Sequence, residues 1–424
     1  MLVSGTMFIN INIQTMTNYL KILFTTFLIS CCFFIISCNK EVQQLELPAK
    51  PIQYGSLLND MIKSNPDYSL YYSLIVKGGQ LSLISDSTRS FTMFVPNNQA
   101  MKRFINIQSG GLIPIGSPEV LFSTFISSAI NKDQAAALVQ YNTMPQSIYT
   151  KDFSSGFPNF FYPTAFNPAP SISELLRLIT YPSSMNGFWL NNIRITNADN
   201  HAYNGVIHQT ELLETPPQRF LWDRINTDTN LVYLKKAIIR ADSGTAAPGF
   251  IQGVLQNIGA NLTLFAPTNQ AFKKSIAPLL VQNLLDHGDS LSHAIQVATI
   301  WVENPDSIFN NPVLYDLLNT QSIGAILAYH VLDTGATFTN NFYTTNTYYH
   351  TFLNRYFPTH PGLQIKVNFG NPYVTSATIK GLVNSSAVDL IINTNPLQAD
   401  PNGTSDQLYL NGVMHKINGV LFPL

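Results

Sequence analysis

The chain has 424 residues, of which 45% are hydrophobic and 11% are charged, and its formal net charge is −1. This length predicts two or three domains with cores of their own, and the composition excludes a disordered polymer. Because no run of Lys or Arg occurs, the electrostatic attraction that dominates nucleic-acid binding is missing, and we expect no nucleic-acid partner.

The first 38 residues have the pattern of an export signal. Lys21 precedes an almost unbroken apolar run, residues 22–37, that ends at Cys38 and is followed by polar residues. The run is shorter than the roughly 20 residues that a membrane-spanning helix needs, which favours a cleaved signal. A retained membrane anchor is the alternative interpretation. Ile35-Ile-Ser-Cys38 resembles the cleavage box of bacterial lipoproteins. A similar box ends at Cys31, but cleavage there leaves an apolar stub, so we expect lipidation of Cys38.

Lipidation of Cys38 has consequences for thiol chemistry and for location. All three cysteines lie in this segment, so the processed chain has no free thiol and no disulfide. The lipid anchor attaches the chain to a membrane, and residues 39–51 form a polar tether. An Asp directly after the lipidated cysteine typically retains lipoproteins in the inner membrane, so Asn39 at this position favours the outer membrane or cell surface. The composition resembles that of surface lipoproteins of Bacteroidetes. A signal peptide usually has basic residues near its start, and none precedes Met16. We therefore expect translation to start at Met1 or at Met16.

Three sequence blocks occur twice in the same order, which is the signature of an internal repeat. Residues 91–102 match 262–273, residues 138–142 match 326–330, and residues 204–208 match 411–415. The separation between matching blocks grows along the chain, so the second copy carries longer inserts. We therefore expect a domain over residues 52–217 and a second over 218–424, joined at a stiff proline pair.

The first block predicts a buried strand that leads directly into a helix. Residues 91–95 and 262–266 are short apolar runs, and each is followed by a proline that cannot donate to a β-ladder. Asn97 and Thr268 come next, and both residue types accept hydrogen bonds from the free N–H groups of a starting helix. The alanine three residues later lies in the first turn, where a small side chain lets the helix approach the sheet.

The third block predicts a strand whose histidine faces the interior. Alternation along the strand places Val206 and His208 on one face and Ile207 and Gln209 on the other. His415 occupies the same position in the second copy. Because the opposite face carries Gln in one copy and Lys in the other, we expect that face to be the wetter one.

The repeated blocks resemble the fasciclin domain family. The pattern Thr-x-Phe-x-Pro-x-Asn-x-Ala is similar to its first signature, and the Asn-Gly-Val-x-His segments are similar to its closing strand. The matching residues are Thr92, Pro96, Asn98, Ala100 and His208 in the first copy and Thr263, Pro267, Asn269, Ala271 and His415 in the second. The resemblance implies an α+β fold in which a wedge of β-sheet is flanked by helices, and a role in adhesion without catalysis.

The central Tyr–His motif of the family has two versions here, Tyr329-His330 and Tyr141-Asn142. In animal relatives this region is linked to integrin binding, so the resemblance makes these four residues a candidate adhesive motif. The residues themselves favour another interpretation. His330 shares a helical face with apolar residues, which predicts a core position with its ring nitrogens bonded to backbone groups. An asparagine reproduces one such hydrogen bond but is no acid–base catalyst.

The inserts are rich in Tyr, Phe, Asn and Pro. They cover residues 153–193 in the first copy and about 275–322 and 344–407 in the second. Loops on a rigid scaffold are the usual place for binding specificity. The aromatic groups at 157–162 and 343–349 either offer stacking surfaces for sugars or peptides, or fasten the loops to their domains.

The sequence contains no motif of a metal site or of an enzyme. His-x-x-x-His pairs, Gly-x-Ser-x-Gly elbows, phosphate-binding loops and dinucleotide fingerprints are missing from it. We therefore expect no enzymatic activity, no cofactor and no metal, and we expect adhesion to an extracellular protein or glycan through the loops. Two alternatives stay open, an accessory glycan- or peptide-binding lipoprotein of an outer-membrane uptake system, and a hydrolase whose triad assembles from distant residues.

Overall fold

The structure, a computed structural model, describes residues 55–400 and 402–423. The predicted signal, Cys38 and the tether 39–51 lie outside these residues, so their interpretation stays a prediction. Residues Gly55–Leu424 belong to one compact unit. Among the described residues, no helix has both the length and the apolar character needed to cross a bilayer.

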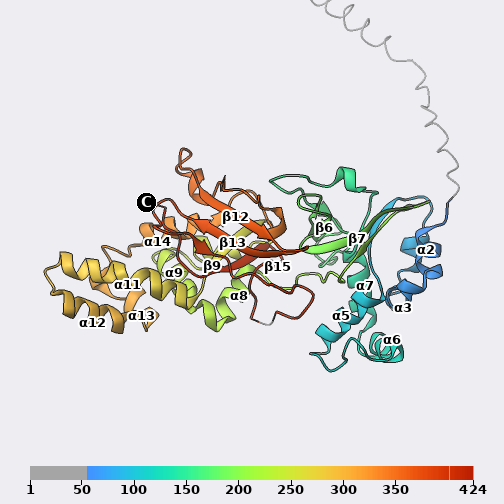
Figure 1. Cartoon of the computed structure of the whole chain (residues 1–424), viewed down its shortest axis with the longest axis horizontal. Coiled ribbons are helices and arrows are strands. Elements are labelled where there is room, and N and C mark those ends of the chain that lie inside the picture. The colour runs from blue at the N-terminus through green and yellow to red at the C-terminus, as the bar shows by residue number, and fades with distance from the viewer. Residues whose placement is uncertain (1–54, 401, 424) are drawn as a thin grey trace, which may run out of the picture. The chain divides into compact units, whose positions relative to one another are not determined.

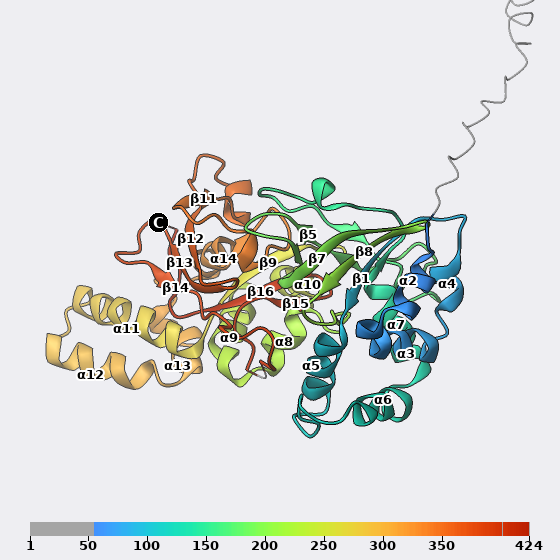
Figure 2. The same cartoon turned by 45° about the vertical axis from the view of Figure 1, so that its right-hand side comes forward.

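The first half of the described chain begins with helices and ends with strands. Its elements are α2 (Leu58–Ser64), η1 (Pro66–Tyr68), α3 (Ser69–Lys77), α4 (Leu81–Ser85), β1 (Phe91–Pro96), α5 (Asn98–Gln108), α6 (Glu119–Ser128), α7 (Lys132–Tyr141), β2 (Thr143–Met144), η2 (Thr150–Asp152), β3 (Tyr162–Pro163), β4 (Ile179–Thr180), β5 (Pro182–Ser183), β6 (Trp189–Leu190), β7 (Ile193–Ala202) and β8 (Gly205–Thr210). The main sheet has the order β2-β1-β8-β7-β6-β5, and Figure 2 shows β1, β8 and β7 side by side.

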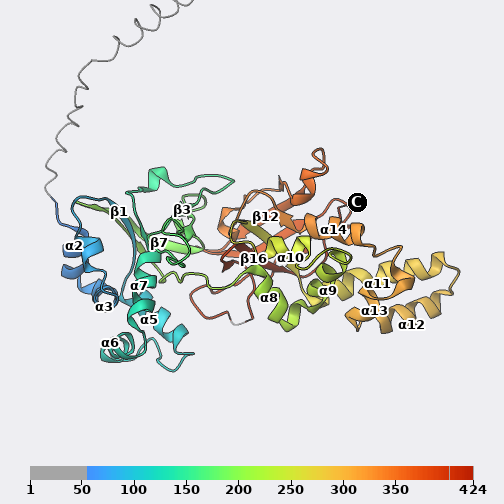
Figure 3. The same ribbon diagram turned by 180° about the vertical axis from the view of Figure 1, so that it is seen from behind.

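The second half has the same order of elements, with a longer helical insert and an additional sheet. Its elements are α8 (Leu221–Thr227), η3 (Thr229–Leu231), α9 (Val232–Ala241), α10 (Phe250–Leu255), β9 (Leu262–Pro267), α11 (Asn269–Asp286), α12 (Leu291–Trp301), α13 (Pro305–Phe309), η4 (Pro312–Leu314), α14 (Thr320–Tyr329), β10 (Val331–Leu332), η5 (Thr339–Asn341), β11 (Thr347–Tyr349), η6 (Phe352–Arg355), β12 (Leu363–Phe369), β13 (Val374–Lys380), β14 (Val388–Asp389), β15 (Gln407–Tyr409) and β16 (Gly412–Ile417). The insert helices α11, α12 and α13 lie together in Figure 3.

The sheets of the second half have the orders β10-β9-β16-β15 and β11-β12-β13-β14. Strands β12 and β13 of the second sheet lie side by side in Figure 1. In both halves the strand of the first block pairs in parallel with the closing strand, and the pairing starts at a glycine. Phe91 is opposite Gly205, and Leu262 is opposite Gly412. This shared framework confirms the predicted α+β fold in two tandem copies, whereas the predicted boundary at residues 217/218 stays a prediction.

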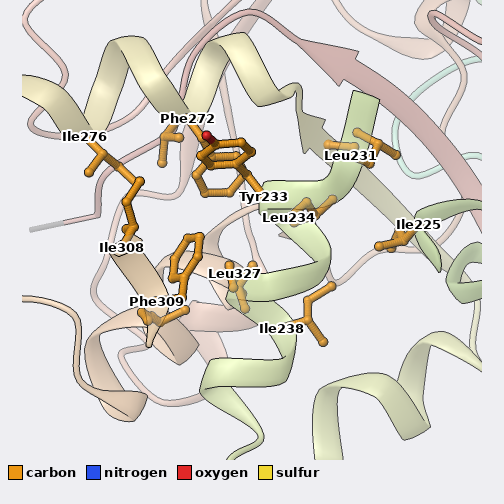
Figure 4. Packing of buried hydrophobic residues seen from close by; sticks show 14 of the residues in the cluster. Ile225, Leu231, Tyr233, Leu234, Ile238, Phe272, Ile276, Ile308, Phe309 and Leu327 are labelled. Carbon is orange, nitrogen blue, oxygen red and sulfur yellow. The ribbon is translucent and has the colours of Figure 1, made fainter. Parts of the chain in front are cut away.

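The central strands are buried on both faces. Phe91, Met93 and Val95 of β1 belong to a core shared with helices α2 to α7, while Phe94 points to the other face and packs with residues of the insert. Figure 4 shows the corresponding helical core of the second half. Its labelled residues are Ile225, Leu231, Tyr233, Leu234, Ile238, Phe272, Ile276, Ile308, Phe309 and Leu327.

The prediction of a wetter face opposite the histidine is wrong in the second half. Met414 and Lys416 on this face are 1% and 4% exposed, because helices cover it. Lys416 tolerates burial since its Nζ is 2.6 Å from a carboxylate oxygen of Asp228. The closing strand is therefore a central strand between two layers rather than a strand with one solvated face.

The predicted turn from strand into helix is confirmed in both halves. The side-chain oxygen of Asn97 accepts a hydrogen bond from the N–H of Ala100 at 2.8 Å, and that of Thr268 accepts one from Ala271 at 3.2 Å. Both alanines are fully buried in the first helical turn. The caps replace intrahelical partners that the first N–H groups lack, so the helix can begin directly after the strand.

Candidate binding surface

The threonines of the first family motif hold the chain that follows the central motif. Thr92 Oγ1 donates to the carbonyl of Gln146 at 2.7 Å and accepts from the N–H of Ile148 at 2.7 Å. In the second half, Thr263 makes the same pair of hydrogen bonds, to Gly335 and from Thr337. Both threonines are fully buried, so they brace the sheet and contact no external ligand.

The asparagines of this motif connect two helices. Asn98 accepts from the N–H of Leu70 at 3.0 Å and donates to the carbonyl of Pro66 at 3.0 Å. Asn269 makes the equivalent bonds, from Tyr233 and to Thr229. Each asparagine thus fastens the helix after the strand to an earlier helix of its own half. Pro96 and Pro267 are the last residues of β1 and β9.

The closing-strand histidines are buried, and both ring nitrogens have backbone partners. In the first half, Nε2 of His208 is 2.9 Å from the carbonyl of Ile148, and Nδ1 accepts from the N–H of Asp199 at 3.2 Å. This pattern defines a neutral ring with the proton on Nε2. Burial lowers the pKa of His208, and the ring of Phe94 stacks on it at 5.5 Å.

The second half repeats this arrangement around His415. Nε2 is 2.9 Å from the carbonyl of Thr337, and Nδ1 accepts from Asp406 at 3.1 Å. Burial lowers the pKa of His415 as well, and Phe265 stacks on its ring at 5.7 Å. Both histidines point inward, as the alternation predicts, and their ring nitrogens are occupied by the backbone.

Sequence reasoning missed the aspartates that complete these arrangements. Asp199 and Asp406 both have φ of 59°, and each carboxylate accepts from the backbone N–H and the hydroxyl of a threonine. The threonines are Thr150 and Thr339. A signal was present in the sequence, because each aspartate precedes the histidine of its closing strand by the same number of residues. An aspartate tolerates left-handed backbone better than most residues, which explains its presence there.

The candidate adhesive motif lies in the core. Tyr329 and His330 are 0% and 1% exposed, and Tyr141 and Asn142 are 1% and 0% exposed. The Tyr329 hydroxyl donates to the carbonyl of Gly362 at 2.8 Å. None of the four side chains reaches the surface, so a direct contact between this motif and a partner conflicts with the structure, and we do not propose one.

His330 and Asn142 make equivalent hydrogen bonds. His330 Nδ1 is 2.7 Å from the carbonyl of Ile326, one turn earlier, and Nε2 accepts from the N–H of Leu421 at 3.0 Å. Asn142 donates to the carbonyl of Leu138 at 2.8 Å and accepts from the N–H of Glu214 at 3.3 Å. The asparagine thus reproduces both bonds, where the sequence predicted one. Burial lowers the pKa of His330 to about 4, so the ring is neutral at physiological pH.

The aromatic residues of the inserts divide into two groups. Phe157 and Tyr349 pack edge to face at 4.7 Å, which fastens one insert to the other. Phe160, Phe161 and Tyr343 remain 64%, 56% and 38% exposed. The packed pair confirms that aromatic rings fasten the inserts, whereas stacking of a ligand on the exposed rings stays a prediction.

A groove of about 770 Å³ lies where the helices of the first half meet the proline linker. Phe104, Ile130 and Leu138 in this groove are buried and apolar, and the linker prolines Pro216 and Pro217 also line it. None of its lining residues carries a charge. Its volume falls within the range of small-ligand sites, and its lining favours an uncharged ligand.

Two observations concern metal binding and acid–base chemistry. Among the described residues, no group of three or more His, Cys, Asp or Glu side chains is arranged to hold a metal ion. Burial raises the pKa of the Glu214 carboxyl to about 7, and its Oε1 accepts a hydrogen bond from Asn191 Nδ2 at 3.0 Å. This carboxyl is enclosed rather than placed in an open cleft, since Glu214 is 8% exposed.

Comparison with known proteins gives a family match for the first half. The family model of the fasciclin domain matches residues 66–212. A solved FAS1 domain pair of the insect cell adhesion molecule fasciclin I is similar over 84% of this chain and 96% of that chain, with 12% identity and a TM-score of 0.30. That score is too low to establish a shared fold, and no curated protein matches the chain significantly in sequence. The family match thus shows a fasciclin domain over residues 66–212, and the second half repeats its parallel strand pairing and its sequence motifs.

Proposed function

We propose that this protein is an exported, lipid-anchored surface protein that binds an extracellular protein or glycan through exposed residues of its inserts. Fasciclin domains are linked to cell adhesion and binding. One observation carries the proposal: the threonine, tyrosine and histidine side chains of the family motifs are buried and bonded to backbone, whereas several aromatic side chains of the inserts are exposed. In this proposal the two domains form a rigid scaffold, and neither half performs a catalytic step.

The anchor in this proposal is a lipid on Cys38, which holds the protein at the outer membrane or cell surface. The support is the apolar run that ends at this cysteine, followed by polar residues. Expression of the full chain in a Gram-negative host with labelled fatty acid tests this step. The wild type should take up label and fractionate with the outer membrane, and Cys38→Ala should do neither. Label that persists on the variant contradicts lipidation at this residue.

The binding step is tested with the soluble form that lacks residues 1–38. We expect this form to bind at least one member of an array of glycans and matrix proteins. A variant with Phe160→Ala and Phe161→Ala should lose that binding, because exposed aromatic rings supply contact area that alanine lacks. Binding that persists in the variant contradicts the placement of the site in the inserts.

The groove favours a second candidate function, an accessory peptide-binding lipoprotein of an outer-membrane uptake system. Its apolar floor fits apolar side chains, and Gln108, Gln134 and Gln218 line it with amides that both donate and accept hydrogen bonds. A library of uncharged peptides separates the two candidates. Ala137→Trp fills the groove. Peptide binding that this substitution abolishes supports the second function. Failure of the wild type to bind any peptide of the library contradicts it.

A further inference from the structure

We propose that the inserts of the two halves form one continuous surface for a neutral polysaccharide. We name this the junction surface and define it by Phe160, Phe161, Tyr343, Thr345 and Asn346. The inference rests on the proposed function, because it names the ligand class of the same inserts.

The first insert meets the segment that leads into the second one. Asn159 Nδ2 donates to Asn341 Oδ1 at 3.3 Å, and the N–H of Phe157 donates to the Tyr343 hydroxyl at 3.4 Å. Phe160 is the next residue after Asn159, so both exposed phenylalanines lie within two residues of a contact with the second half. The junction surface therefore continues an interface that the chain already forms within itself.

The junction surface is rigid near its aromatic rings. Asn159 and Asn341 are 8% and 1% exposed, and Tyr343 stacks on the buried Tyr349 at 6.4 Å. The backbone N–H of Tyr343 donates to the Tyr349 hydroxyl at 2.9 Å. Exposed rings on a fixed backbone lose little conformational entropy when a ligand stacks on them.

The segments that carry the junction surface are uncharged. Residues 153–173 and 334–354, which carry the junction surface, contain no Asp, Glu, Lys or Arg. A charged ligand placed on this surface would lose hydration without gaining an ionic partner from these segments. The surface therefore selects an uncharged ligand.

The composition of these segments favours a polysaccharide over an uncharged protein surface as the ligand. The exposed side chains between the aromatic rings are Thr344, Thr345 and Asn346, whose hydroxyl and amide groups both donate and accept hydrogen bonds. A sugar ring presents an apolar face for stacking and a rim of hydroxyl groups that do the same. Protein interfaces, in contrast, concentrate their affinity in Trp, Tyr and Arg residues that fit buried pockets, and these two segments contain no Arg or Trp.

Affinity electrophoresis of the soluble form lacking residues 1–38 tests the inference. The probes are a neutral β-glucan, a neutral mannan and a neutral xylan cast in the gel, with heparin as the charged polysaccharide. We expect at least one neutral polysaccharide to retard the wild type and heparin to have no effect. The Phe160→Ala/Phe161→Ala variant and the Tyr343→Ala variant should each bind at least about fivefold more weakly, since each lost stacking contact is worth about 1 kcal/mol.

Two control variants keep the test specific. Phe250 is 68% exposed on another element, so Phe250→Ala removes a comparable ring and should leave retardation unchanged. Tyr343→Phe keeps the ring and removes the hydroxyl that contacts Phe157, so it should retain most of the affinity. Retardation equal to wild type in both alanine variants overturns the inference.

The remaining outcomes distinguish the inference from the function on which it rests. Failure of every neutral polysaccharide overturns the inference. If a protein or a charged glycan then binds the wild type and loses binding in the same variants, the proposed function stands with another ligand class. If neither the array nor the gels reveal a ligand, both the inference and the proposed function fail.

Discussion

Asn142 and His330 occupy the same place in the two halves, and the hydrogen bonds of one predict the behaviour of the other. Both side chains accept from a backbone N–H of the closing segment and donate to a carbonyl one turn earlier. The imidazole differs in one respect, because it can gain a proton. Since its buried ring has a pKa lowered to about 4, the native state resists that proton while the unfolded chain accepts it near pH 6.5.

The first prediction concerns acid stability. The wild type should lose about 2 kcal/mol of stability between pH 8 and pH 5 from His330 alone, because the unfolded state binds the proton and the native state does not. His330→Asn should remove this loss and still fold at pH 8, as Asn142 does in the first half. Urea unfolding at both pH values measures the difference. His350→Asn, at an exposed position, is the control, and an unchanged pH dependence in His330→Asn contradicts the prediction.

The second prediction concerns Glu214, whose carboxyl stays protonated up to about pH 7 because it is buried. A raised pKa gives stability that is present below the unfolded pKa of 4.5 and is lost as pH rises through 7. The loss between pH 4.5 and pH 8 is about 3 kcal/mol for this group. Glu214→Gln keeps the acceptor for Asn191 and cannot ionise, so it should be more stable than the wild type at pH 8 and similar at pH 4.5. A stability difference between this variant and the wild type that does not change between pH 4.5 and pH 8 would contradict the prediction.

At the scale of elements, the parallel pairing of the first and closing strands depends on one glycine in each half. Gly205 has φ of 156°, and a Cβ there would lie 2.0 Å from the carbonyl oxygen of Phe91. Gly412 has φ of 148° and the same conflict with Leu262, at 2.2 Å. The glycine of the Asn-Gly pair in the family motif is therefore required for the strand pairing itself.

The third prediction follows from this close approach. Gly205→Ala should destabilise the protein by at least about 3 kcal/mol, since it combines a strained backbone with a backbone clash. Thermal unfolding measures the change. The control is Gly324→Ala in α14, where nothing lies within 4 Å of the new Cβ and alanine should stabilise the helix by about 0.5–1 kcal/mol. Equal effects of the two substitutions would contradict the role given to Gly205.

The elements that the sequence predicted well are those determined by neighbouring residues. An apolar run, a proline and a capping residue place the first strand and the following helix, because each acts within a few positions. The burial of Lys416 escaped prediction, because its carboxylate partner Asp228 is far away in the sequence. The additional sheet β11–β14 and the contact between the inserts also escaped, because neither has a counterpart in the repeated blocks.

The candidate site shows the same division. The alternation along the closing strands correctly predicted that His208 and His415 face the interior, and the helical spacing correctly predicted that His330 lies in the core. The resemblance alone had made the Tyr–His region a candidate surface, and burial contradicts that. The junction surface needs Asn159 and Asn341 to meet across the two halves, which no local pattern encodes.

At the scale of the whole molecule, the two halves share a polar interface. Asn341 Nδ2 donates to Ser183 Oγ at 2.8 Å, and Asn340 Nδ2 donates to the carbonyl of Asn191 at 3.1 Å. Asn186 donates back to the carbonyl of Asn340 at 3.0 Å. The bonds donated by Asn340 and Asn341 are buried, so losing one of them leaves a partner without compensation by water.

The fourth prediction is that these asparagines couple the unfolding of the two halves. The soluble form should unfold in a single calorimetric transition, and Asn341→Ala should reduce the coupling by about 1–3 kcal/mol and separate the transition into two. Asn346→Ala, exposed on the same insert, should leave the single transition intact. Two transitions in the wild type itself would show that the halves unfold independently.

The central claim is that the inserts bind the ligand and the buried family motifs only stabilise the fold. One binding experiment on three proteins tests it most directly. The soluble form, its Phe160→Ala/Phe161→Ala variant and its His330→Asn variant are compared on the same array at pH 8, with the melting temperature of each recorded. We expect the insert variant to lose the ligand with an unchanged melting temperature, and the scaffold variant to keep it. Loss of the ligand in His330→Asn, with full binding by the insert variant, would contradict a binding site in the inserts.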